Sequence, residues 1–151
     1  ITHFYIKTDE FNKYLTFESK VIAAAAQSNI SNEKKLKLVR ITLEVLQKKF
    51  SRCNINEEDF LVASRVMENA VMVLMAIEAG TEVISTFLDT PNHLQAHSSG
   101  VSIIATLIAK KLGWSSSLAL RKVAMAGLFH DIGKRDFPDK LQLSRPSLLS
   151  T

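Results

Sequence analysis

The sequence predicts an all-α protein, and three of its features support this fold class. Hydrophobic residues make up 46% of the 151 residues, which is enough for a buried core and argues against global disorder. Only 5 glycines and 3 prolines are present, and this scarcity favours long helices over a turn-rich β fold. Apolar side chains recur at helical spacing along most of the chain. We therefore expect a bundle of long helices.

Periodicity predicts three amphipathic helices in the first part of the chain. The first runs from about residue 9 to 27, and the second from about residue 33 to 50. The third is long, from about residue 57 to 88, with an Asn56–Asp59 capping arrangement and a kink near Gly80. The second helix buries one of two stripes: Leu36, Val39, Leu43 and Leu46, or Leu36, Arg40, Leu43 and Gln47.

A turn signal at residues 89–92 divides the chain, since proline disfavours helix in the residue before it. We place a domain boundary there, between a helical region at 1–90 and a second unit at 91–151. The first region carries no recognisable chemistry of its own. It is expected to be regulatory or to form a homodimer through its helices.

The second unit is expected to begin with two helices. One covers about residues 93–112 and ends at Gly113, a good helix stop. The next is capped within Ser115–Ser117 and ends between residues 128 and 130. An irregular stretch follows from Ile132.

The charge is distributed unevenly along the chain. Residues 1–96 hold 11 Lys/Arg and 12 Asp/Glu, whereas residues 97–151 hold 8 Lys/Arg and 3 Asp/Glu. A local positive field favours an anionic ligand such as a phosphate ester, although a solvated basic surface has the same composition. Aromatic residues are not interleaved with these charges, so specific nucleic-acid binding is not expected.

Composition also bears on the compartment. The single cysteine, Cys53, excludes an intrachain disulfide and fits a reducing environment. The longest apolar run, residues 71–79, is interrupted by Glu78 and is too short for a membrane span. Because no secretory leader precedes the helices, we expect a cytoplasmic protein.

The chemistry is concentrated around an adjacent His130–Asp131 pair. It follows the apolar run 123–129 and offers an imidazole nitrogen and a carboxylate oxygen, which suit iron, manganese or zinc. His97 opens an amphipathic helix and could bring a second imidazole to the same place. Lys134 lies just after a glycine, where its ammonium could meet a phosphate. Taken singly, each of these residues is also compatible with an ordinary structural or solvated role.

Together the residues match a known pattern. The stretch HSSGVSIIATLIAKKLGWSSSLALRKVAMAGLFHDIGK, residues 97–134, resembles the HD superfamily of metal-dependent phosphohydrolases, particularly its HD-GYP branch. The following RDFPDKLQLSRPSLLST is also similar to this branch. The resemblance covers about residues 91–151 and implies an all-α bundle of the HD-domain type.

The resemblance implies roles for individual residues. His97, His130 and Asp131 would ligate metal, with Asp131 bridging two ions, and Lys134 would contact the substrate phosphate. Asp131 and Lys134 would be the catalytic residues, and Arg135 is a weaker candidate for the phosphate. The branch resembles cyclic di-GMP phosphodiesterases, which use two divalent metals, commonly iron or manganese, and sometimes a third. The implied substrate is therefore a cyclic dinucleotide used in second-messenger signalling.

Two departures from the branch matter. Its remaining ligands and its Gly-Tyr-Pro loop lie beyond Thr151, and Asp136 and Asp139 are too close to the His-Asp pair to replace them. We therefore expect a fragment that is inactive alone.

Where three-metal members carry a carboxylate, this chain has His93, either a substitute metal ligand or a surface residue. Two other functions stay open: a non-catalytic HD-like signalling or interaction module, and an HD nucleotide phosphohydrolase.

Overall fold

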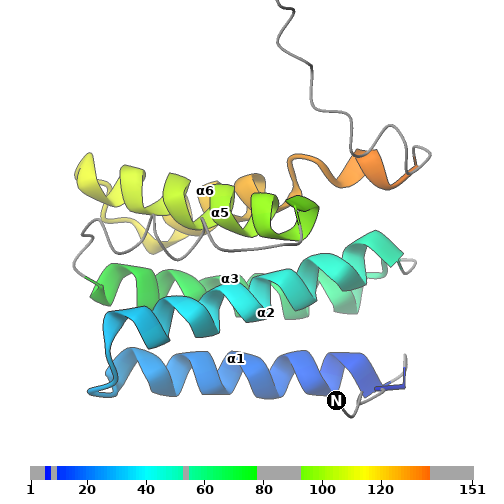
Figure 1. The fold of residues 1–151 in the computed structure, drawn as a ribbon, viewed down its shortest axis with the longest axis horizontal. Helices are drawn as coiled ribbons and strands as arrows, with labels where there is room; N and C mark the ends of the chain where they lie inside the picture. Colours follow the sequence, from blue (N-terminus) through cyan, green and yellow to red (C-terminus); the bar gives the residue numbers. More distant parts are fainter. Residues whose placement is uncertain (1–5, 8–9, 53–54, 78–92, 137–151) are drawn as a thin grey trace, which may run out of the picture.

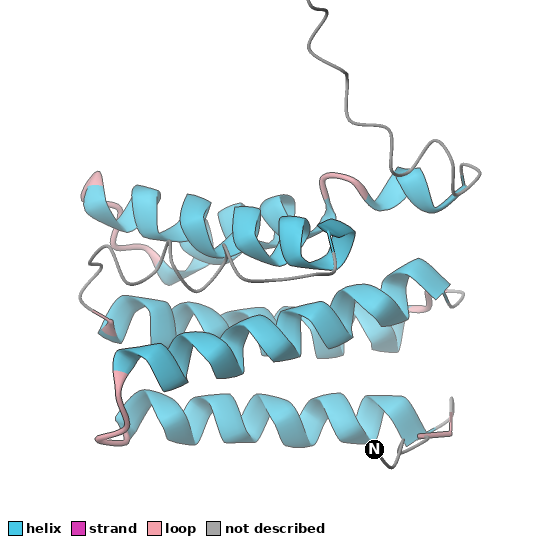
Figure 2. Ribbon diagram, in the orientation of Figure 1, coloured by secondary structure: helices cyan, strands magenta, loops and turns pink. Residues whose placement is uncertain are grey.

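The computed structural model describes residues 6–7, 10–52, 55–77 and 93–136, and every regular element in these ranges is a helix (Figures 1 and 2). The expected all-α fold class is confirmed. None of the described helices is long and apolar enough to cross a membrane. The elements are α1 (Phe11–Gln27), α2 (Asn32–Arg52), α3 (Glu57–Ala76), α5 (His93–Lys111), α6 (Ser117–Phe129) and the 3-10 helix η2 (Ile132–Asp136).

The helices stack in layers, with α1 on one side, α2 and α3 in the middle, and α5 and α6 on the other side (Figure 1). Helix α1 packs mainly on α3, and α5 packs mainly on α6. The middle helices join the two sides, because α2 contacts α5 and α3 contacts α6. The short helix η2 also lies against α2.

One hydrophobic core runs through these layers and takes side chains from all five α-helices. Of the two stripes considered for α2, the apolar one is confirmed, because Leu36, Val39, Leu43 and Leu46 are all buried. The core therefore combines residues from both sides of the expected boundary near residue 90. That boundary itself lies outside the described residues, as does the expected kink near Gly80.

Helix ends follow local sequence signals at several places. Asn56 and Asp59 form a capping box at the start of α3, with Asp59 N donating to Asn56 Oδ1 at 2.8 Å and Asn56 N donating to Asp59 Oδ2 at 3.1 Å. Ser116 caps α6 through the amide of Ala119. Gly113 follows α5 with φ of 87°, a backbone conformation that favours glycine.

The expectation of one long helix over residues 57–88 was wrong. Helix α3 ends at Ala76, and Ile77 is extended. The reason is a contact distant in sequence: Lys110 Nζ of α5 donates to the carbonyl oxygens of Met75 at 2.8 Å and Ile77 at 2.6 Å. This ammonium satisfies carbonyls at the end of α3 that would otherwise need further helical turns or water.

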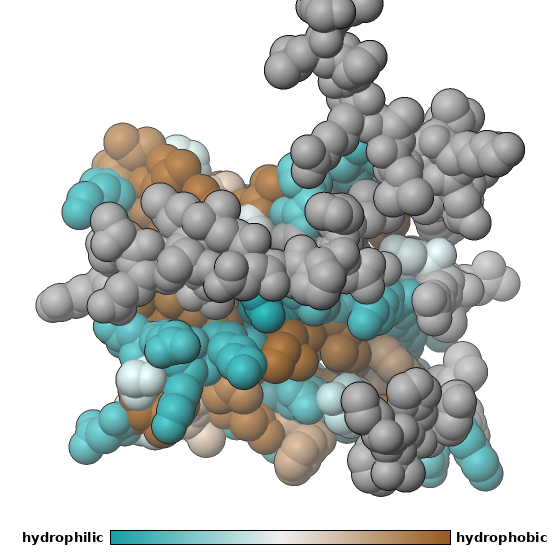
Figure 3. Space-filling model, in the orientation of Figure 1, coloured by the Kyte–Doolittle hydropathy of each residue, from teal (hydrophilic) through white to brown (hydrophobic). Residues whose placement is uncertain are grey.

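The surface is not uniformly polar. Figure 3 shows apolar surface over the end of the molecule where α5 turns into α6, at the upper left. Exposed apolar side chains in this part of the chain are Ile108, Leu112, Trp114 and Leu118. The outer face of α5 is thus apolar without being buried, in contrast to the core-facing stripe of α2.

A buried ion pair connects the first three helices. Lys49 of α2 pairs with Asp59 of α3, and both side chains are less than a tenth exposed. Asn12 of α1 donates from Nδ2 to Asp59 Oδ1 at 2.9 Å, and Lys49 also donates to Asn12 Oδ1. Burial raises the pKa of Asp59, but hydrogen bonds from Lys49, Asn12 and the Asn56 amide, with the charge of Lys49, outweigh it, so the pKa is lowered.

We predict that Asp59→Asn destabilises the protein by about 3–5 kcal/mol at neutral pH, because it leaves the Lys49 ammonium buried without its partner. Since the folded pKa is lowered, the contribution is fully present above about pH 4, near the ordinary value of an unfolded aspartate. It is lost as the pH falls through the folded pKa. Urea unfolding of both proteins over this range should show the difference in stability shrinking on acidification. Glu10→Gln, which removes a carboxylate from an exposed pair with Lys13, should change stability little.

Candidate metal centre

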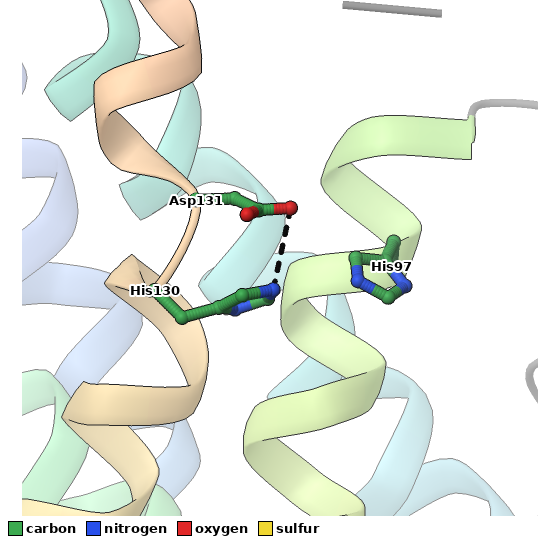
Figure 4. Close-up of side chains that lie close together, drawn as sticks. All are labelled: His97, His130 and Asp131. Carbon is green, nitrogen blue, oxygen red and sulfur yellow. Dashed lines mark ion pairs between the residues drawn. The ribbon is translucent and has the colours of Figure 1, made fainter. Parts of the chain in front are cut away.

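Three potential metal ligands meet where the start of α5 approaches the end of α6. His97 lies in the second turn of α5, His130 is the C-cap of α6, and Asp131 follows it. One ligand atom from each residue lies within 4.8 Å of the other two. Figure 4 shows His130 and Asp131 directed toward each other beside the helix that carries His97. The structure thus brings together the three residues that the sequence singled out.

A glycine sets the distance between the two helices. A Cβ atom placed on Gly127 would lie 2.8 Å from Ser102 Cα and 3.0 Å from Ser102 N, and both of these are backbone atoms of α5. Ser102 Oγ in turn donates to the carbonyl oxygen of Ala124 at 2.7 Å. Because Gly127 and Ser102 lie within a few residues of His130 and His97, this backbone contact brings the two imidazoles together. Their ring centroids are 5.3 Å apart.

The same glycine orients His130. The Nδ1 atom of His130 lies 2.8 Å from the carbonyl oxygen of Gly127, which can only accept, so the hydrogen bond assigns a proton to Nδ1. In the neutral imidazole the lone pair is then on Nε2, which lies 3.3 Å from Asp131 Oδ2. A histidine that donates one ring N–H to a backbone carbonyl keeps the lone pair of its other nitrogen for a metal ion, which is the arrangement typical of metal-ligating histidines.

Asp131 supplies an ionised oxygen to the centre. Burial raises the pKa of this carboxyl, since its side chain is only 15% exposed. A hydrogen bond from Lys134 and the charges of His130, Lys134 and His97 outweigh burial, so the pKa is lowered. At neutral pH Asp131 is therefore a carboxylate, a hard anionic ligand that suits manganese or iron.

Lys134 reaches the centre from η2. Its Nζ donates to Asp131 Oδ2 at 2.6 Å, which is the oxygen that also faces His130 Nε2. The lysine side chain is about half exposed, at 49%. An ion pair at this exposure contributes little to stability, so the ammonium can exchange Asp131 for another anion at small cost.

The remaining candidates are described only in part. Helix α5 begins at His93, which places its backbone one turn before His97. The side chains of His93, Arg135 and Asp136 lie outside the described residues, and so does the whole segment 137–151. The roles of His93 and Arg135 stay predictions.

The donor set fits a divalent metal ion. Two imidazoles and one carboxylate are ligands that iron, manganese and zinc accept, and three protein ligands leave coordination positions for water or substrate. Helix α6 adds a favourable field, because its C-terminus, where His130 and Asp131 lie, carries partial negative charge.

Sequence reasoning identified the ligand candidates but missed the residue that holds them together. Gly127 lies within the apolar run 123–129, where a glycine lowers helix stability compared with alanine. An isolated glycine in such a helix often marks a close packing contact. The position of Gly127, three residues before His130, was the sequence signal that could have indicated this close packing contact.

We predict that Gly127→Ala weakens both the fold and metal binding. The new methyl group must displace the backbone of α5, at a cost of about 1–3 kcal/mol that exceeds the gain of about 1 kcal/mol in helix propensity. Urea unfolding and titration with Mn²⁺ measure the two effects. Gly133→Ala is the matched control, because a Cβ there meets no atom within 4 Å. Unchanged stability and Mn²⁺ affinity in Gly127→Ala would contradict the role of this contact.

The segment that contains the candidate metal centre matches a known protein family. Residues 94–148 match the HD domain family, and they include His97, His130, Asp131 and Lys134. No match was found among curated proteins or among solved structures. The match supports an HD-superfamily phosphohydrolase, a family whose domains bind divalent metals, for the part of the chain that carries the candidate centre.

Proposed function

We propose that this protein is part of a metal-dependent phosphodiesterase that hydrolyses a cyclic dinucleotide, cyclic di-GMP, in second-messenger signalling. The observation that carries the metal-dependent activity is the orientation of His130, whose Nε2 faces Asp131 while Nδ1 donates to Gly127. The choice of substrate rests on the resemblance of residues 91–151 to the HD-GYP branch.

His97, His130 and Asp131 would hold the first divalent metal, iron or manganese. A metal bound there supplies a Lewis acid for the phosphoryl oxygens and an activated water for attack on phosphorus. A second metal would share Asp131, since a carboxylate has two oxygens. A third metal would use His93 as a ligand.

The charges around the centre support an anionic substrate. The segment from His93 to His130, which forms α5 and α6, contains four Lys/Arg and no Asp or Glu. Asp131 is therefore a small negative site at the end of a basic helix pair. A cation would bind at Asp131, and the surrounding positive field would attract a phosphate ester.

Lys134 is the residue proposed to contact that phosphate. Its ammonium already lies 2.6 Å from Asp131 Oδ2, so it is held at the edge of the centre. A cation held by His97, His130 and Asp131 would compete with Lys134 for the carboxylate and repel the ammonium. A phosphate brought to the same place would then accept the hydrogen bonds of Lys134.

We predict that the chain binds a divalent metal, and that His130→Ala or Asp131→Asn weakens Mn²⁺ binding by at least about tenfold, since the first removes a ligand atom and the second removes the charge of a carboxylate ligand. Isothermal titration and elemental analysis of the purified protein measure this. His3→Ala, outside the matched segment, is the control for loss of one histidine. A folded wild-type protein that binds none of Mn²⁺, Fe²⁺ and Zn²⁺ would exclude the enzyme and favour a non-catalytic signalling or interaction module.

The substrate class has a separate test in protein that binds metal. Hydrolysis of cyclic di-GMP supports the proposal. Hydrolysis of nucleoside phosphates without activity on cyclic dinucleotides would indicate the HD nucleotide phosphohydrolase instead. A homodimer formed through the N-terminal helices and a cytoplasmic location stay predictions.

We further predict opposite effects of Lys134→Ala on two ligands. Removing a competing cation from Asp131 should tighten Mn²⁺ binding by about twofold to fivefold, as expected for a partly exposed ion pair. Binding of inorganic phosphate to the Mn²⁺-loaded protein should weaken. Lys122→Ala removes an exposed lysine from α6 and should leave both affinities close to wild type. Phosphate binding that is equal in wild type and Lys134→Ala would contradict the proposed contact.

A further inference from the structure

The N-terminal helices carry none of the candidate ligands and lie outside the segment that matches the HD domain family. Even so, the end of α2 packs close to the candidate metal centre, since Phe50 of α2 contacts Phe129 beside His130. Helix α2 contacts α5, α6 and η2, which are the three elements that carry His97, His130 and Lys134. The geometry of the centre therefore depends on a helix that supplies no ligand to it.

The closest link is a pair of aromatic rings. Phe50, near the end of α2, is 3% exposed, and its ring centroid lies 4.8 Å from that of Phe129 at an interplanar angle of 35°. Phe129 is the last residue of α6 and immediately precedes His130. A displacement of the Phe129 backbone therefore also moves His130, which is the next residue.

The His-Asp pair is held on both sides by apolar residues. Phe129 precedes the pair and Ile132 follows it, and both are partly buried against the common core. Polar ligands thus project from a short segment whose two ends are anchored by apolar packing. On the α2 side, the described ring contact of Phe129 is with Phe50.

The position of Phe50 is itself fixed. The preceding residue, Lys49, is buried and pairs with Asp59 of α3 and Asn12 of α1. This network fixes the rotation of α2 and its position along the bundle one residue before Phe50. The ring of Phe50 is therefore a rigid support for Phe129.

We propose that Phe50 is a positioning residue for His130, so that the N-terminal helices are a structural part of the metal centre. The proposal rests on the assignment of His130 as a ligand. Without the Phe50 ring, Phe129 settles into the vacated space and the turn after α6 relaxes. The hydrogen bond from His130 Nδ1 to the Gly127 carbonyl is then lost, and Nε2 no longer has a fixed direction.

The test compares Phe50→Ala and Phe50→Leu with wild type through two measurements. Nitrogen-15 NMR of the imidazoles reports which ring nitrogen of His130 carries the proton and needs no metal. We expect the Nδ1–H form to dominate in wild type and to give way to a mixture of tautomers in both variants. Titration with Mn²⁺ should show about tenfold weaker binding in Phe50→Ala, as for loss of a group that orients a metal ligand.

Leu36→Ala is the matched control. Leu36 is a fully buried residue of the same helix, about 21 Å along it from Phe50, and its truncation also leaves a cavity. It should reduce stability to denaturant while the tautomer of His130 and the Mn²⁺ affinity stay at their wild-type values. Phe50→Leu keeps most of the apolar bulk and so remains folded if Phe50→Ala does not.

Four outcomes decide the proposal. A tautomer shift in the Phe50 variants that is absent from Leu36→Ala supports it. An unchanged tautomer and Mn²⁺ affinity in Phe50→Leu overturn it, and so does an equal loss in Leu36→Ala, which would show a general effect of stability. If wild type binds no Mn²⁺ but the tautomer shift is seen, the proposed enzyme fails, and only the dependence of the His130 orientation on Phe50 stands.

Discussion

The close backbone approach of α5 and α6 at Gly127 and Ser102 is the contact on which the candidate centre depends. Because Gly127 has no Cβ, its backbone can lie against Ser102, and the start of one helix meets the end of the other. Ligands more than thirty residues apart in sequence are thereby brought within reach of one ion. The carbonyl of Gly127 then accepts a hydrogen bond from Nδ1 of His130. One residue therefore fixes both the separation of the helices and the direction of an imidazole.

The electrostatics of the centre follow from its place at a helix end. Carbonyl groups at the C-terminus of α6 and the Asp131 carboxylate make a negative site, and the Asp131 pKa is lowered because cations surround that carboxyl. The rest of the α5–α6 pair is basic. A small negative site on a positive surface suits a cation and an anionic substrate together. That combination is the one that metal-assisted phosphoryl chemistry requires.

The predictions from sequence succeeded where the signals are local and failed where they are not. The stripe of α2, the Asn56–Asp59 box and the stop at Gly113 depend on neighbours within one or two turns, and the structure confirms each. The end of α3 depends on Lys110, more than thirty residues away, so periodicity alone extended the helix too far. The ligand candidates were found through a family resemblance. Their mutual distances, and the glycine that sets them, required the fold.

The N-terminal helices share one hydrophobic core with the segment that matches the HD domain family. The resemblance begins near residue 91, and the family match covers residues 94–148. Yet the buried side chains of α5 and α6, such as Ile103 and Leu128, belong to the same core as those of α2 and α3. An autonomous domain would have its own core and a polar boundary with its neighbour. Within the described residues, the helices that precede the matched segment supply part of the apolar core that supports the candidate metal centre.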